Sequence, residues 1–216
     1  MKHDTVALFS QPVTKVDINI DGIAEFFDEV VKPTQGEINH NRTQQEESLI
    51  HYHNDDNVFN IYSELNELRD SILEASNFAY QRVMNYDGKL NITNAWFNLC
   101  DVGGSQFMHN HCNSVISGTL YLRTDINTNI QFLTPFRGSE TSNSLVDIPN
   151  LSRENEYGYS FHYDMCTITA GNGTCLFWPS YLKHGYINNQ TPNRLSLSFN
   201  FMVESFNNVY NPFFIS

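Results

Sequence analysis

The chain has 216 residues, a mass of 24.9 kDa and a formal net charge of −12. This length suits one domain. The negative charge disfavours binding to nucleic-acid phosphates, and no apolar run is long enough to cross a membrane. Four cysteines without a CxxC spacing, and a polar N-terminus without a secretory signal, predict reduced thiols and a cytoplasmic protein.

The N-terminal part of the sequence predicts short strands followed by helices. Residues 5–20 alternate loosely and predict one or two strands, whereas residues 22–31 have helical apolar spacing. Residues 34–56 are polar and predict a loop. Residues 57–86 carry the clearest apolar stripe, which predicts one long helix that covers a sheet.

The rest of the chain predicts a β domain, because short apolar runs alternate with Gly, Asn, Asp and Pro turns. The expected strands are 93–100, 106–111, 115–123, 129–133, 159–169, 174–178, 184–188 and 194–204. Helices followed by strands predict an α+β, mainly β fold, in which a sandwich or barrel carries the helices on one sheet. We expect a single domain over 1–216, with an N-terminal extension 1–88, a β core 89–204 and a C-terminal tail 205–216.

Three histidines and an arginine indicate chemistry. His109 and His111 are two apart in a predicted strand, so their side chains face the same way, and neutral imidazoles are good ligands for Fe(II). His184 follows a glycine turn, an apolar strand and a Trp-Pro corner that would aim it back into a barrel. The fork of Arg194 suits a carboxylate, and Ser196 on the same face adds a hydroxyl donor. Each of these residues, taken singly, is also compatible with an ordinary structural role.

Together these motifs resemble the Fe(II)- and 2-oxoglutarate-dependent oxygenases, over roughly residues 93–203. The pattern is similar to that of a subgroup from marine bacteria and their phages. The residues that carry the resemblance are Trp96-Phe-Asn98, Gly103-Gly104, His109-Asn-His111, Ser117-Gly118, Tyr121, Leu176-Phe-Trp-Pro179, His184 and Arg194-Leu-Ser196.

The resemblance implies a double-stranded β-helix, or jelly-roll, dioxygenase that uses Fe(II) and 2-oxoglutarate to hydroxylate an unidentified substrate. It implies that His109 and His184 bind the metal. It also implies that Arg194 and Ser196 hold the distal carboxylate of 2-oxoglutarate. Asn98 matches a residue that contacts this cosubstrate in related enzymes, and Tyr121 is a second candidate for the same contact.

His111 departs from the family pattern, which places Asp or Glu two positions after the first histidine. Three imidazoles would make the metal site more cationic than a site with a carboxylate. Either His111 is the third ligand, or it turns away and leaves a position for water or a halide. Asp101 is a further candidate ligand.

Two other functions remain open at this point. One is a cupin-like three-histidine metalloenzyme that uses no 2-oxoglutarate, and the other is a non-catalytic β-sandwich used for binding or structure. The substrate is not readable from the sequence, and the edge of a β-barrel is compatible with a homodimer.

Overall fold

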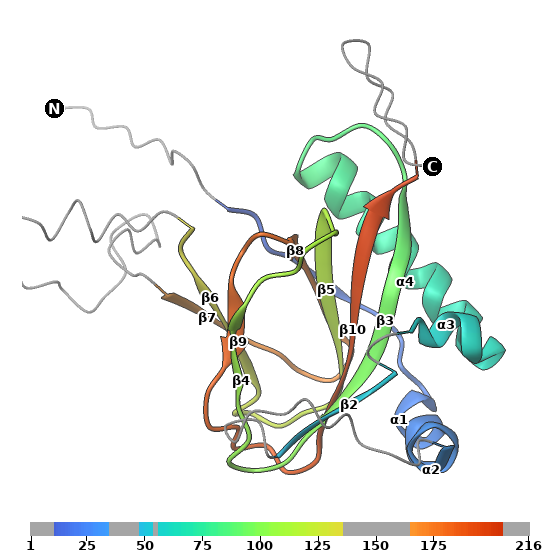
Figure 1. Ribbon diagram of the computed structural model, residues 1–216, viewed down its shortest axis with the longest axis vertical. Helices are drawn as coiled ribbons and strands as arrows, with labels where there is room; N and C mark the ends of the chain where they lie inside the picture. Colours follow the sequence, from blue (N-terminus) through green and yellow to red (C-terminus); the bar gives the residue numbers. More distant parts are fainter. Residues whose placement is uncertain (1–10, 35–47, 54–55, 136–164, 205–216) are drawn as a thin grey trace, which may run out of the picture.

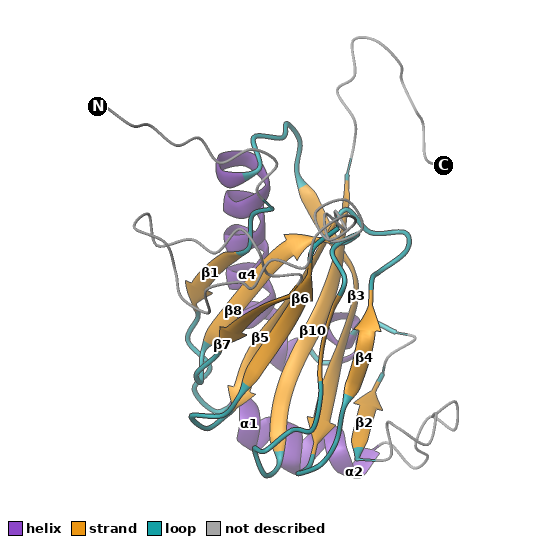
Figure 2. Cartoon of the chain, turned by 90° about the vertical axis from the view of Figure 1, so that its left-hand side faces the viewer, coloured by secondary structure: helices purple, strands orange, loops and turns teal. Residues whose placement is uncertain are grey.

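Two antiparallel sheets face each other, and helices cover the outer side of the larger one (Figures 1 and 2). This computed structural model describes residues 11–34, 48–53, 56–135 and 165–204. The larger sheet has the order β1-β8-β5-β10-β3-β2 and the smaller one β4-β9-β6-β7. From β4 onward the chain passes repeatedly between the sheets, which is the path of a jelly roll.

The strand bounds are as follows. The larger sheet contains β1 (Thr14–Asp17), β2 (Leu49–Tyr52), β3 (Leu90–Cys100), β5 (Ile116–Arg123), β8 (Thr174–Pro179) and β10 (Arg194–Val203). The smaller sheet contains β4 (Gln106–His109), β6 (Asn129–Leu133), β7 (Met165–Thr169) and β9 (His184–Tyr186).

The helices are short and interrupted. They are α1 (Ile23–Phe26), the π turn η1 (Phe27–Val31), α2 (Lys32–Thr34), α3 (Val58–Ile61), the 3-10 turn η3 (Ser63–Leu65), α4 (Asn66–Phe78) and the π turn η4 (Ala79–Val83). None of the helices in the described part of the chain is long and apolar enough to span a membrane.

The two faces of β10 have different surroundings: one packs in the core under the helices, and the other lines the pockets between the sheets. Successive side chains of a strand point to opposite faces. Leu195, Leu197, Phe199 and Phe201 are fully buried in the cluster under the helices. The residues that alternate with them are polar and line the pockets described below: Arg194, Ser196, Ser198 and Asn200. Burial of each apolar side chain contributes about 1.5–3 kcal/mol, so this register is strongly favoured.

Two glycines, Gly118 of the family motifs and Gly185 directly after His184, permit close approach of strands near the histidines. A Cβ atom on Gly118 of β5 would lie 2.6 Å from the carbonyl oxygen of Leu176. A Cβ atom on Gly185 of β9 would lie 2.9 Å from the carbonyl oxygen of Phe107. Neither distance is compatible with a side chain.

The structure corrects the predicted loop at 34–56. Residues 49–52 form β2, which pairs with β3 at the edge of the larger sheet. Leu49 and Tyr52 are buried, but a strand of four residues is too short to show a clear alternation in the sequence. The rest of this loop, apart from residues 34, 48, 53 and 56, lies outside the described residues.

The predicted helix at 57–86 is also wrong as a single element. Tyr62 adopts an extended backbone with φ −117° and ψ 105°, which separates α3 from α4. Asn57 caps α3 by accepting a hydrogen bond from the Phe59 amide, and it also donates to the Ile92 carbonyl oxygen on β3. The apolar stripe over 57–86 therefore indicates which side chains pack against the sheet, but it does not show that the helix is continuous.

The predicted strand at 106–111 ends at His109. The amide of His111 donates to the carbonyl oxygen of Ser180, which draws the chain out of the smaller sheet. The expected strands over 5–20 and 159–169 are present as β1 and β7 only where residues are described, because 5–10 and 159–164 lie outside the described part. The expected tail 205–216 lies outside it as well.

Candidate metal and cosubstrate site

The three predicted histidines converge between the sheets. His109 ends β4 and His184 begins β9, directly opposite it in register. His111 follows two residues after His109. One nitrogen from each ring can be chosen so that all three lie within 4.8 Å of one another. Two nitrogens that bind one ion at about 2.1 Å are at most about 4.2 Å apart, so small movements of the side chains would let all three rings share an ion.

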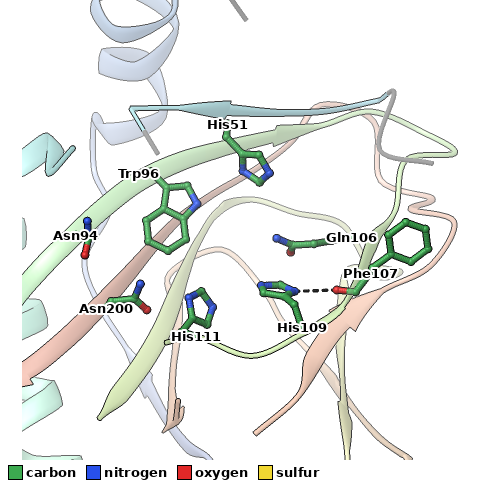
Figure 3. A pocket seen from close by; sticks show the side chains of 8 residues that line it. All are labelled: His51, Asn94, Trp96, Gln106, Phe107, His109, His111 and Asn200. Carbon is green, nitrogen blue, oxygen red and sulfur yellow. Dashed lines mark hydrogen bonds between the residues drawn. The ribbon is translucent and has the colours of Figure 1, made fainter. Parts of the chain in front are cut away.

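Backbone carbonyl groups fix the tautomers of two of these rings. Nδ1 of His109 lies 2.7 Å from the carbonyl oxygen of Phe107 (Figure 3), and Nδ1 of His184 lies 3.0 Å from that of Leu182. Because a carbonyl oxygen only accepts, each Nδ1 carries the proton and each Nε2 keeps its lone pair. Both Nε2 atoms are therefore available to coordinate a metal ion.

His111 turns toward the other two histidines and not away from them. Its Nε2 lies 3.2 Å from Nε2 of His184, and the two rings are 8° from parallel. Two nitrogens bound at right angles to one ion at about 2.1 Å would be separated by about 3 Å. Asp101 is elsewhere: its Oδ1 accepts from the amides of Val102 and Asn193.

Burial keeps His111 and His184 neutral. Desolvation, followed by the charge of His109, lowers the pKa of His111 to about 4 and that of His184 to about 3. The Leu182 carbonyl opposes this shift at His184 only in part. At pH 7 both rings are in the form that binds metal.

These pKa values predict that the metal-free protein loses stability in acid. The unfolded chain protonates both histidines near pH 6.5, whereas the folded protein resists until about pH 4 and 3. Stability should therefore be nearly constant above about pH 7.5 and fall by roughly 3–4 kcal/mol, about half from each histidine, between pH 7 and pH 5. Urea unfolding in the presence of a chelator measures this. A double variant, His111→Gln with His184→Gln, should show a flatter profile, and an equally steep profile would contradict the assignment.

Arg194 is a buried cation in the same region. Its side chain is 4% exposed, and its guanidinium carbon lies 3.7 Å from the ring centroid of Tyr186. One guanidinium nitrogen donates to the carbonyl oxygen of Asn129 at 3.0 Å, and to the hydroxyl of Tyr121 at 3.5 Å. None of the ion pairs among the described residues involves Arg194. Because a buried charge without a counter-ion is unfavourable, this arrangement suits an anionic ligand.

An inner cavity joins Arg194 to the histidines. Its walls include Ser196 and Tyr121, the predicted partners of Arg194, together with Asn98. The cavity has a volume of about 30 Å³, which is enough for a water molecule. A diacid would therefore have to move side chains apart when it binds.

Two of the predicted cosubstrate contacts are held by neighbours. Burial raises the pKa of Tyr121, although Arg194 partly opposes this, so its hydroxyl remains a donor. The side-chain oxygen Oδ1 of Asn98 accepts a hydrogen bond from Nδ1 of His51 at 2.6 Å. Its side-chain nitrogen Nδ2 donates to the hydroxyl of Ser198 at 2.8 Å. Contact of Tyr121 and Asn98 with a cosubstrate stays a prediction.

An outer pocket of about 410 Å³ adjoins the inner cavity and shares Trp96, Gln106, His109 and His111 with it (Figure 3). Its described lining contains no carboxylate, lysine or arginine: His51, Asn94, Trp96, Gln106, Phe107, His109, His111 and Asn200. His51, Asn94, Gln106 and Asn200 were missed in the sequence. The alternation of Asn94, Trp96 and Asn98 on β3 was the available signal for Asn94, whereas His51 depended on the strand that was not predicted.

Comparison with known proteins identifies the family. Residues 94–200 match a family described as "Putative 2OG-Fe(II) oxygenase", where 2OG is 2-oxoglutarate. The chain belongs to the 2OG-Fe(II) oxygenases. No curated protein sequence matches it.

Solved structures with the same fold as this oxygenase share little sequence with it. The epimerase SnoN from nogalamycin biosynthesis is 12% identical, with a TM-score of 0.61 over 90% of this chain and 80% of that one. HygX from Streptomyces hygroscopicus, solved with nickel, 2-oxoglutarate and hygromycin B, is 11% identical, with a TM-score of 0.56 over 90% and 84%. A prolyl-4-hydroxylase from Pseudomonas putida is 11% identical, with a TM-score of 0.58 over 91% and 95%.

These findings confirm several expectations for the oxygenase. They confirm the α+β, mainly β jelly roll with helices on one sheet, the enzyme class, and the use of Fe(II) and 2-oxoglutarate. They set aside the cupin-like and non-catalytic alternatives. The ligand set and the cosubstrate contacts remain predictions, as does the marine and phage subgroup.

Proposed function

We propose that the oxygenase binds Fe(II) through His109, His111 and His184, binds 2-oxoglutarate through Arg194 and Ser196, and hydroxylates a small molecule in the outer pocket. The observation that carries this proposal is the lining of the inner cavity, which contains both the converging imidazoles and the buried guanidinium of Arg194, a cation with no counter-ion among the described residues.

The described residues fit both groups. Two rings present unprotonated Nε2 atoms, and acidic pKa values keep His111 and His184 neutral. Three neutral ligands add no charge, so a dianion would balance the two charges of Fe(II). When bound, Fe(II) would activate O2, with 2-oxoglutarate as the co-reductant: one oxygen atom would enter the succinate formed with loss of CO2, and the other would enter the hydroxylated substrate.

The chain's own residues would orient the reactants and exclude water. The fork of Arg194 can hold one carboxylate at a fixed distance from the histidines, which directs the other end of the diacid toward them. Trp178 and Phe132 pack against His184 with ring centroids 4.6 and 6.1 Å away, which keeps that side apolar. The outer pocket lies against His109 and His111, where a substrate would be next to the metal.

Hydroxylation is the reaction that we propose among the outcomes open to such enzymes. The Pseudomonas putida neighbour is described as a prolyl-4-hydroxylase, whereas SnoN is described as an epimerase. An uncharged lining suits a neutral, hydrogen-bonding substrate.

The test is an anaerobic titration of the protein with Fe(II) and then 2-oxoglutarate. We expect the weak visible charge-transfer band of the chelate, and one succinate for each 2-oxoglutarate consumed after oxygen is admitted. Bound iron without the band and without succinate would contradict the proposal.

We also propose a reducing compartment such as the cytoplasm. All four cysteines (Cys100, Cys112, Cys166, Cys175) lie among the described residues as free thiols, and Cys112 and Cys166 are exposed. Exposed thiols persist where glutathione keeps them reduced.

A further inference from the structure

The indole nitrogen of Trp178 is a buried donor without an acceptor. Trp178 lies on β8 and is 2% exposed, and its Nε1 has no hydrogen-bond partner in the described part of the structure. Buried tryptophans usually find a partner for this N–H group. Leaving it unmatched costs free energy that the apolar packing of the ring has to offset.

The position of Trp178 relates this donor to the cosubstrate. Trp178 lines the inner cavity together with Arg194 and Ser196. Its ring also meets His184 at a centroid distance of 4.6 Å and an angle of 61°. The ring that carries this donor therefore lines the same cavity as the proposed metal ligands and the guanidinium of Arg194.

Two unmet requirements in one small cavity indicate one ligand. Among the described residues, Arg194 has no anionic partner and the indole nitrogen of Trp178 has no acceptor. A dicarboxylate supplies both a negative charge and several acceptor oxygens. A neutral ligand would satisfy the indole but leave the guanidinium unpaired.

We propose that the indole N–H of Trp178 donates a hydrogen bond to a carboxylate oxygen of bound 2-oxoglutarate, so that Trp178 is a cosubstrate-binding residue. This proposal rests on the proposed function. The hydrogen bond has a charged acceptor, so its loss should weaken binding of 2-oxoglutarate by about 10- to 100-fold.

The first experiment replaces the donor and keeps an aromatic ring. Trp178→Phe should raise the Kd of 2-oxoglutarate for the Zn(II)-loaded protein by about 10- to 100-fold in calorimetry, with Zn(II) affinity unchanged. Leu176→Val is the packing control, because Leu176 belongs to the same apolar cluster but does not line the cavity. An equal loss of affinity in Leu176→Val would assign the effect to packing and overturn the proposal.

The second experiment measures binding on the wild-type protein and uses the variant only to assign a signal. The chain has only 2 tryptophans, so a ¹⁵N-tryptophan spectrum contains two indole signals, and Trp178→Phe assigns them by loss of one. Adding 2-oxoglutarate to the Zn(II)-loaded protein should move the Trp178 indole proton downfield and slow its exchange with solvent.

The outcomes separate this proposal from the proposed function. Calorimetric binding of 2-oxoglutarate with an unmoved Trp178 signal would overturn the role of Trp178 alone. Absence of any 2-oxoglutarate binding by the wild-type protein would overturn both proposals.

Discussion

Replacing Arg194 by Ala should weaken 2-oxoglutarate binding by more than about 100-fold, because a buried carboxylate left without its partner costs about 3–5 kcal/mol. Metal affinity should be unchanged, since the proposed ligands are His109, His111 and His184 and not Arg194. Calorimetry with Zn(II)-loaded protein measures both affinities, and thermal unfolding shows whether the variant is folded.

Two further variants make this result specific. Arg194→Lys should recover only part of the affinity, because lysine keeps the charge but lacks the planar fork. Arg123→Ala is the matched control: Arg123 pairs with Asp28 at the surface and does not line the cavity. Unchanged 2-oxoglutarate affinity in Arg194→Ala would mean that Arg194 serves only its contacts with Tyr186 and the Asn129 carbonyl.

The sequence predicted the parts of the fold in which local pattern and burial agree. β10 alternates polar and apolar residues from Arg194 to Phe201, so its core face and its cavity face can both be read from a period of two. The Gly-rich turn, apolar strand and Trp-Pro corner before His184 correspond to β8 and the turn into β9. In these segments a single rule decides the structure.

The sequence failed where long-range pairing decides the structure. β2 exists because Leu49–Tyr52 pair with β3, and a four-residue strand has too little pattern to be distinguished from the loop around it. The missed strand carries His51, which contacts Asn98 and lines the outer pocket. Helical periodicity likewise does not reveal the extended backbone at Tyr62 or the contacts of Asn57 with β3 that fix the start of α3.

His109 and His111 lie close together, as the sequence predicted, but not because both belong to one strand. We expected both rings on one face of a strand, but the strand ends at His109. The amide of His111 is tied to Ser180, and this turn still brings its ring to 5.1 Å from that of His109. Spacing in the sequence therefore indicated proximity, whereas the turn determines the direction of the third ring.

Replacing His111 by Ala should reduce Fe(II) affinity by more than about 100-fold, because even the loss of a residue that only supports a ligand commonly costs 10- to 100-fold. His53→Ala is the control, since His53 lies outside the cluster and contacts Tyr62. Iron content after gel filtration, with the chelate band in 2-oxoglutarate, measures the effect. Stoichiometric iron and an unchanged band in His111→Ala would establish a two-histidine centre with a position open to water or a halide.

The variant His111→Asp separates the number of ligands from their charge. A carboxylate can replace the imidazole as a ligand, so this variant should bind Fe(II) more tightly than His111→Ala. It also adds one negative charge next to the site of a dianion, which should weaken 2-oxoglutarate binding by roughly tenfold or more relative to the wild type. Tighter 2-oxoglutarate binding in His111→Asp would contradict the idea that three neutral imidazoles favour the dianion. Because His111→Ala tests whether the third imidazole binds iron and His111→Asp tests why an imidazole suits that position, the pair of variants can confirm the ligand and still reject its electrostatic role.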